Sequence, residues 1–353
     1  MISILIISGI LLFAVVFTLL FRTQVLLNVL KGSYNKRVDV AGNKVHGILF
    51  VIFMIVFFVG MFGYHEIAKK DYLPEAASIH GLEADSLFWI SMIIILIAFV
   101  ITNILLFVFP YLYAYRDDRR GYYYPDNHTL ERIWTIVPAV VLVILLFSGL
   151  KLWTTITQTE APANATIIEV MGKQFAWQVR YPGKDNKLGE YNFRRIDPNN
   201  EFGIKVEDKS SHDDFIPREL HFQKGNPVLL KIRARDVIHS VFLPHFRVKM
   251  DAVPGMQTSF LFTPTTSTAE MRAKTNDPEF NYELACTEVC GRGHFAMRFL
   301  VVVDEPAEYQ KWLASQKSWK SQNEDYFAET LKKVTTKPKS NEPKVHQKEH
   351  ASL

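Results

Sequence analysis

Cysteine is scarce in this chain: among 353 residues there are two, Cys286 and Cys290. Neither belongs to a Cys-x-x-Cys-His sequence, which excludes covalent attachment of a c-type haem. The net charge is also small, +4 at pH 7. Part of that excess lies in loops between apolar runs and in the C-terminal tail, so it does not indicate nucleic-acid binding. No internal repeat is visible, and the near-neutral mean hydropathy averages two very different halves.

Long apolar runs dominate the first half of the chain. A membrane-spanning helix needs roughly 20 mostly apolar residues. Four runs qualify, at residues 1–21, 47–63, 87–113 and 133–153. The first has no basic residue before its apolar core and no small-x-small cleavage pattern, so we expect it to be retained as a membrane helix and not removed as a signal peptide.

The basic residues of the connecting loops predict the orientation of these helices. The loop after the first run and the loop after the third are both basic, and both are expected on the cytoplasmic side. Their basic residues are Arg22, Lys31, Lys36, Arg37, Lys44, Arg116, Arg119, Arg120 and Arg132. The loop between the second and third runs carries more acidic than basic residues and is expected outside. Four crossings then put the whole second half of the chain on the outer side.

The outer half contains short runs of β-branched and aromatic residues. They are residues 166–170, 174–181, 228–233, 237–243, 258–262, 280–285 and 296–303. Such spacing predicts an antiparallel sandwich or barrel and not βαβ units. Within 174–181, Phe175, Trp177, Val179 and Tyr181 alternate with less apolar residues. This alternation predicts that Phe175 and Trp177 point to the same side of one strand.

The remaining segments of the outer half have other patterns. Residues 182–224 are polar and rich in turn formers, which predicts a long excursion with little core. Residues 305–313 predict a helix with proline in its first turn, and a second helix is expected to run to about residue 334. Residues 335–353 are rich in lysine and have almost nothing to bury, so we expect disorder there.

The two cysteines lie in the sequence Cys286-Thr-Glu-Val-Cys-Gly-Arg-Gly-His-Phe-Ala-Met297, which also supplies His294. Thiolate and thioether ligands favour copper, whereas imidazole suits copper or zinc. His239 lies upstream on the predicted strand 237–243, which a sandwich would bring beside the cysteine loop. The sequence therefore predicts a site with two thiolates and two imidazoles.

Three other interpretations of these residues remain open from the loop alone. The cysteines could form a disulfide in an oxidising compartment, although the ring that it closes would be very small. Cys286, Cys290, His294 and His239 could form a four-coordinate structural zinc site. Alternatively, His239 could be an ordinary core histidine and Met297 a packing residue.

A count of the ligands favours two copper ions. One blue-copper ion takes two histidines, one cysteine and a weak axial ligand, which leaves one thiolate unused here. Two ions bridged by both thiolates would use every group, with one imidazole on each ion. Met297 would be the weaker ligand of one ion, and the backbone carbonyl of Glu288 that of the other.

These residues resemble subunit II of the haem–copper cytochrome c oxidases. The resemblance rests on Cys-x-Glu-x-Cys-x-x-x-His-x-x-Met, on Asp-Val-Ile-His ending at His239, and on Lys-Met-Asp-Ala-Val-Pro-Gly ending at Gly255. His-Thr-Leu-Glu-Arg-Ile-Trp-Thr-Ile-Val-Pro, ending at Pro138, resembles the start of that family's last transmembrane helix. The likeness covers about residues 85–313 and implies a cupredoxin domain with a dinuclear copper A centre. The implied ligands are His239, Cys286, Glu288, Cys290, His294 and Met297.

The resemblance also implies an electron relay. A c-type cytochrome would reduce the copper pair, which would pass electrons to haem in subunit I, where oxygen becomes water while protons are pumped. The side chain of Glu288 would contribute to a magnesium site completed by subunit I. Glu131, at the cytoplasmic start of the fourth crossing, would admit protons, although an acid in a first helical turn is also stabilised by the helix dipole.

The chain departs from the family pattern at three places. The family usually has Gln-Trp-x-Trp where this chain has Gln174-Phe-Ala-Trp177, so electron uptake is assigned to Phe175 and Trp177 in the place of a tryptophan pair. Met256 stands where arginine is common. The family usually has two crossings, so the first two here are additional, and packing against neighbouring subunits is their expected use.

We therefore expect four transmembrane α-helices followed by an outer all-β cupredoxin-like sandwich, short C-terminal helices and a disordered tail. The expected domains are an additional helix pair at residues 1–84, a transmembrane hairpin at 85–153, the periplasmic copper A domain at 154–313 and a basic tail at 314–353. The expected location is a bacterial plasma membrane. The expected partners are subunit I, other oxidase subunits and a c-type cytochrome, soluble or held in a supercomplex, and no nucleic acid.

Proteins of other classes share parts of this pattern. A quinol-oxidising relative would keep the sandwich and the hairpin but lack the copper ligands. A membrane-anchored copper carrier or sensor would keep the ligands without an oxidase. A copper A domain serving a periplasmic reductase would not need Glu131 or the matched fourth helix.

Overall fold

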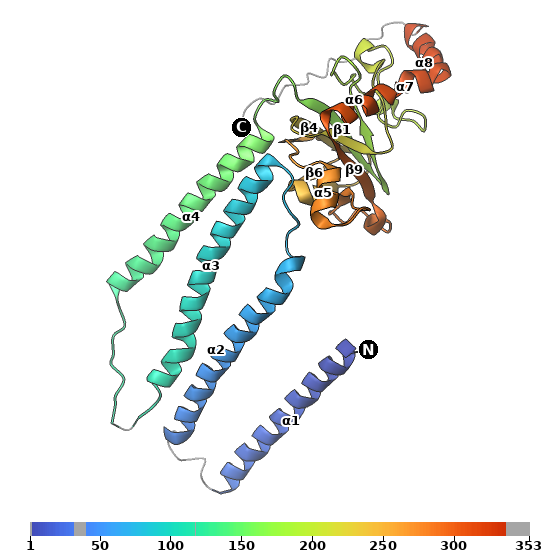
Figure 1. The fold of residues 1–353 in the computed structure, drawn as a ribbon. Coiled ribbons are helices and arrows are strands. Elements are labelled where there is room, and N and C mark those ends of the chain that lie inside the picture. The colour runs from blue at the N-terminus through green and yellow to red at the C-terminus, as the bar shows by residue number, and fades with distance from the viewer. Residues whose placement is uncertain (1, 32–39, 117, 337–353) are drawn as a thin grey trace. The chain divides into compact units, whose positions relative to one another are not determined.

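The computed structural model describes residues 2–31, 40–116 and 118–336 (Figure 1). The chain divides into two compact units. One holds the residues up to 72 together with 93–131, and the other holds 73–92 together with the chain from 132 onward. The predicted disorder of 335–353 falls almost entirely outside the described residues.

Four long helices occupy the first half of the chain. They are α1 (Ile2–Leu30), α2 (Val40–Ala68), α3 (Ile79–Leu112) and α4 (His128–Thr157). Each is long and apolar enough to cross a membrane, which confirms the four predicted runs. Their leucine, isoleucine, valine and phenylalanine side chains are largely exposed. A helix that is apolar all round is stable in this state when lipid surrounds it.

Two β-sheets make up the outer domain. The first has the strand order β2-β1-β4-β7, with β1 (Thr166–Lys173), β2 (Ala176–Arg180), β4 (Val228–Ala234) and β7 (Thr258–Phe262). The second has the order β3-β9-β8-β5-β6, with β3 (Leu220–Gln223), β5 (His239–Leu243), β6 (Val248–Ala252), β8 (Tyr282–Cys286) and β9 (Arg298–Asp304). Apolar side chains from both sheets belong to one buried core, so the domain is a sandwich, as predicted.

The sandwich is mixed and not purely antiparallel as predicted. β1 and β4 pair in parallel, with Val170 opposite Ile232, and β3 and β9 also pair in parallel. Parallel neighbours need a long connection. For the first pair, the connection consists of β2, the polar excursion and β3, which together lie between β1 and β4 in the chain.

Residues 182–224 were predicted to have little core, and this prediction is wrong. Three apolar residues of this excursion, Phe202, Ile204 and Val206, are fully buried. They form a second core cluster with Met171 of β1 and with residues of the C-terminal helices. The excursion thus lacks regular strands over most of its length but still buries apolar surface.

Helices complete the outer domain. They are α5 (Thr268–Thr275), α6 (Pro306–Ser315), α7 (Trp319–Gln322) and α8 (Glu324–Thr336). The predicted helix 305–313 corresponds to α6, which has proline in its first turn. α7 and α8 together correspond to the second predicted helix, and Trp319 and Phe327 attach them to the second core cluster.

Candidate metal centre

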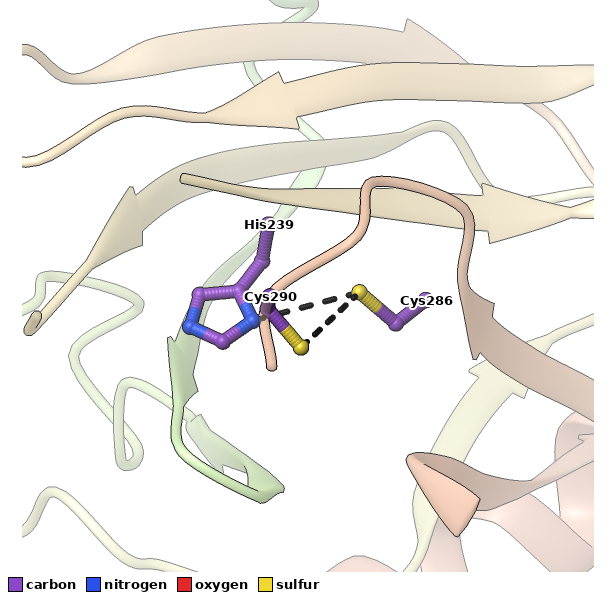
Figure 2. Close-up of side chains that lie close together, drawn as sticks. All are labelled: His239, Cys286 and Cys290. Atoms are coloured by element: carbon purple, nitrogen blue, oxygen red, sulfur yellow. Dashed lines mark hydrogen bonds between the residues drawn. The ribbon is translucent and has the colours of Figure 1, made fainter. Parts of the chain in front are cut away.

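Two neighbouring strands bring the cysteine loop to His239. β5 begins at His239 and β8 ends at Cys286, and the two strands pair antiparallel with Val241 opposite Cys286. Because antiparallel strands place the start of one beside the end of the other, the loop after Cys286 begins next to His239. Figure 2 shows the imidazole and both thiols pointing toward one another.

The sulfur atoms form the centre of this cluster. The Sγ atoms of Cys286 and Cys290 are 4.0 Å apart, and Nδ1 of His239 lies 3.9 Å from the Cys286 sulfur (Figure 2). The metal-binding atoms of these three residues all lie within 4.8 Å of one another.

The other predicted ligands surround the same two sulfur atoms. Nδ1 of His294 lies 3.7 Å from the Cys290 sulfur, and Sδ of Met297 lies 3.3 Å from it. The carbonyl oxygen of Glu288 lies 3.2 Å from the Cys286 sulfur. Every residue predicted as a copper ligand thus has a donor atom within 4.0 Å of a cysteine sulfur.

The disulfide interpretation is wrong, because both thiols are free and their sulfur atoms are 4.0 Å apart. A disulfide bond would bring them to about 2.05 Å. His239 and Met297 are buried, as ordinary core residues would be. However, Nδ1 of His239 faces the Cys286 sulfur and Sδ of Met297 faces the Cys290 sulfur, as metal ligands would.

The donor set fits a metal. With a metal–thiolate bond of about 2.3 Å, one ion can touch two sulfurs that are up to about 4.6 Å apart, so ions can bridge these two. Two thiols, two imidazoles and the thioether of Met297 form a soft donor set that favours copper. A four-coordinate Cys₂His₂ zinc site would leave the thioether unused. Burial, together with the nearby Cys286, raises the pKa of the Cys290 thiol to about 11. A cation at the centre would therefore displace protons as it binds.

Asp236 orients the buried imidazole. Oδ1 of Asp236 lies 2.8 Å from Nε2 of His239, which leaves Nδ1 free to face the sulfur. Burial alone would raise the pKa of Asp236, but hydrogen bonds from His239 and from the backbone N–H groups of Gln174 and Val237 lower it below its ordinary value. The sequence interpretation gave Asp236 no role. Its position three residues before a candidate ligand was the available signal.

Gly172 of β1 leaves space for the same imidazole. A Cβ atom at this position would lie 2.9 Å from the His239 ring and 3.0 Å from the Trp177 ring. The two rings meet edge to face with centroids 5.9 Å apart. Any larger residue at position 172 would displace His239, and a lone glycine in a strand was the only sequence signal.

Phe175 and Trp177 do not belong to the same strand and differ in burial, which corrects the prediction from alternation. Trp177 is 3 % exposed and Phe175 is 42 % exposed. The strand begins at Ala176, so Phe175 lies in the turn before it and escapes the strand's alternation. The indole N–H of Trp177 has no hydrogen-bond partner among the described residues.

The last residues to place are Glu288, Glu131 and Met256. Glu288 and Met256, which is one of the departures from the family pattern, are exposed on loops of the outer domain. Glu131 belongs to the other compact unit, in the first turn of α4, where its Oε2 lies 3.3 Å from Nδ1 of His128.

Two known families match this chain. The family described as "Cytochrome C oxidase subunit II, transmembrane domain" matches residues 67–152, and "Cytochrome C oxidase subunit II, periplasmic domain" matches residues 166–304. The chain is thus similar to membrane proteins that carry a domain outside the membrane.

Relatives with curated descriptions agree with this match. An alternative cytochrome c oxidase subunit 2 of Bradyrhizobium diazoefficiens is 34% identical over 236 residues, which are 66% of this chain and 78% of that protein. A cytochrome c oxidase subunit 2 of Cereibacter sphaeroides is 27% identical over 253 residues, covering 68% of this chain and 76% of that protein. The crystal structure of the periplasmic domain of subunit II of cytochrome oxidase of Bradyrhizobium japonicum matches 44% of this chain and 96% of that chain, with 22% identity and a TM-score of 0.30.

Proposed function

The chain belongs to the cytochrome c oxidase subunit II family, and from that premise we propose that it is the copper-bearing subunit of a proton-pumping oxidase. When bound, a pair of copper ions would accept single electrons from a c-type cytochrome and pass them to haem in subunit I, where oxygen is reduced to water. The observation that carries this proposal is the gathering of two imidazoles, a thioether and a carbonyl around two free thiols.

Cys286 and Cys290 would supply the two thiolates that hold the copper pair. His239 and His294 would each supply one imidazole, since their Nδ1 atoms lie beside different sulfurs. Met297 and the carbonyl of Glu288 likewise lie beside different sulfurs and would be the weaker ligands.

Residues around the ligands exclude water and fix their orientation. His239 is fully buried, Cys290 is 3 % exposed and Met297 is 2 % exposed. Asp236 holds the His239 imidazole through Nε2, so the ring needs no rearrangement when the charge of the site changes. A buried and oriented imidazole suits electron transfer because little has to move as the electron arrives and leaves.

Three further assignments complete the proposal. The exposed carboxylate of Glu288 would contribute to a magnesium site completed by subunit I. Glu131, at the start of a membrane-spanning helix, would admit protons to the oxygen-reducing subunit. Phe175 at the surface and Trp177 beneath it would take up electrons from the cytochrome, because Trp177 contacts the ring of His239.

The proposed arrangement in the cell follows from the four apolar helices and the basic loops. The chain would lie in a bacterial plasma membrane, with an additional helix pair at residues 1–84, a hairpin at 85–153, the copper A domain at 154–313 on the periplasmic side and a basic tail at 314–353. Its partners would be subunit I, other oxidase subunits and the c-type cytochrome.

Purification of the tagged full chain from its native membranes in mild detergent tests this assignment. A subunit of an oxidase should bring with it a haem-bearing membrane subunit, seen as haem absorption and oxygen consumption with reduced cytochrome c. Isolation of the chain alone with its copper, under conditions that keep other respiratory complexes together, would instead indicate a membrane-anchored copper carrier.

A further inference from the structure

The turn between β1 and β2 contacts the segments on both sides of the candidate metal centre. Nε2 of Gln174 donates a hydrogen bond of 2.6 Å to the carbonyl oxygen of Cys290. This contact joins residues 116 positions apart and ends on the backbone of a predicted ligand. The side chain of Gln174 thus holds the cysteine loop directly.

The same residue also contacts the His239 side of the site. The backbone N–H of Gln174 donates a hydrogen bond of 2.7 Å to Oδ2 of Asp236. The other carboxylate oxygen of Asp236 lies 2.8 Å from Nε2 of His239. Gln174 therefore connects the carbonyl of one cysteine to the imidazole of the opposite segment through a single carboxylate.

Phe175 closes the turn over the cysteine loop. Its ring lies so close to the loop backbone that a Cβ atom at Gly293 would be 2.6 Å from Cγ of the ring. Between Cys286 and Met297 the loop contains only one short 3₁₀ turn, His294–Ala296, among its described elements. Contacts from outside are therefore needed to hold its ligands in position.

We propose that Gln174 is a positioning residue of the metal centre, which fixes the distance between the Cys290 and His239 sides through its side-chain amide and its backbone N–H. This inference rests on the proposed function, since it concerns the geometry of the same copper site. Loss of the side-chain bond frees the Cys290 carbonyl and the loop behind it, so the copper ions are held less tightly and less symmetrically. Mutation of a residue that hydrogen-bonds to a metal ligand commonly lowers metal affinity by about 10–100-fold.

Gln174→Met is the sharpest variant, because methionine has a similar length but cannot donate a hydrogen bond. It keeps the backbone contact with Asp236 and removes only the bond to Cys290. Gln322→Met is the matched control, since Gln322 also donates from Nε2 to a backbone carbonyl, that of Lys317, at 2.8 Å, in the C-terminal helices. Gly293→Ala is an independent variant that displaces the Phe175 ring from the other side.

The three variants and the wild-type full chain are compared as purified copper-loaded complexes. The measurements are copper per chain, the hyperfine pattern in electron paramagnetic resonance, the near-infrared band and the rate of copper loss to a Cu(I) chelator. We expect Gln174→Met and Gly293→Ala to lose copper about tenfold faster and to show altered spectra, while Gln322→Met matches the wild type. A change in the spectra distinguishes positioning from a general loss of stability.

Unaltered spectra and an unaltered release rate in Gln174→Met, with normal loading of the wild type, would overturn this inference and leave the proposed function intact, whatever Gly293→Ala shows. A wild-type chain that takes up no copper pair would instead reject the proposed function, and this inference with it.

Discussion

The two aromatic side chains of the proposed electron-entry site differ in exposure. Phe175 is exposed in the turn, and Trp177 lies beneath the surface with its ring against His239. Trp177 thus contacts a candidate metal ligand, and Phe175 is the one of the two that a docked protein can reach. Phe175 offers only an apolar face, because it has no N–H group to donate.

Phe175→Ala should slow reduction of the metal centre by the native cytochrome about tenfold. An aromatic residue at the centre of a contact commonly contributes more than 1 kcal/mol to docking, and about 1.4 kcal/mol corresponds to a factor of ten. Stopped-flow mixing with the reduced cytochrome measures this rate, and Phe193→Ala, at another exposed phenylalanine, is the control. An unchanged rate would show that electrons enter elsewhere.

Glu131→Gln should lower turnover and proton pumping by at least about tenfold, because an amide cannot take up and release a proton. Oxygen consumption and the acidification of the medium by reconstituted vesicles measure the two quantities. The control is Glu66→Gln, which removes an exposed acid at the end of α2 and should leave both quantities unchanged. If Glu131→Gln turns over and pumps as the wild type does, Glu131 is simply a stabilising acid at a helix N-terminus.

The candidate ligands could be picked out from the sequence, whereas the residues that hold them could not. Cysteine, histidine and methionine have few other uses at such close spacing, so their chemistry identifies them. Gln174 and Asp236 are common residues, and their contacts join positions 62 and 116 apart in the chain. Only the packed fold brings these partners together.

Among the elements, the long helices and most strands followed from their sequence patterns, and the missed elements have different causes. β3 has four residues, too short for a clear alternation. β6 has five, and the alternation of its apolar residues with Lys249 and Asp251 was a readable signal that went unused. α5 has eight residues, but its capping box of Ser267 and Glu270 was a readable signal that went unused. The parallel pairing of β1 with β4 could not be predicted from the sequence of either strand, because it depends on the path of the long segment between them.

The excursion and the C-terminal helices meet at a buried charged group. Oδ2 of Asp214 accepts hydrogen bonds from Nη1 of Arg180 at 2.9 Å and from the N–H of Gly189 at 3.1 Å, while its carbonyl accepts one from the N–H of Trp319. Burial raises the pKa of Asp214 to about 7, although Arg180 opposes the rise. The folded domain therefore binds this proton more tightly than the unfolded chain does.

A raised carboxyl pKa makes stability fall with rising pH. The contribution of Asp214 is complete below about pH 4, near its ordinary value, and is lost as the pH rises toward 7. Asp214→Asn should therefore gain stability relative to the wild type by about 2–4 kcal/mol between pH 4 and pH 7. Urea unfolding followed by tryptophan fluorescence measures the difference, with exposed Asp325→Asn as control. Parallel pH profiles for wild type and Asp214→Asn would contradict this account.

The described part of the chain combines four helices able to span a membrane with one outer sandwich that carries the candidate metal ligands. This division could be predicted from the sequence, because helices in lipid are apolar all round, whereas the elements of a domain in water have alternating or mixed patterns of apolar and polar residues. Every functional assignment of the outer half depends on what its two thiols bind. The number and kind of metal ions are therefore the central claim.

Metal analysis of the purified full chain, combined with electron paramagnetic resonance, tests this claim most directly, and Cys290→Ser serves as the control. We predict two copper ions per chain and a mixed-valence spectrum in which one unpaired electron is shared by both ions, with both features lost in Cys290→Ser. Zinc, a single copper ion with a spectrum of one nucleus, or a centre that survives Cys290→Ser would contradict the account.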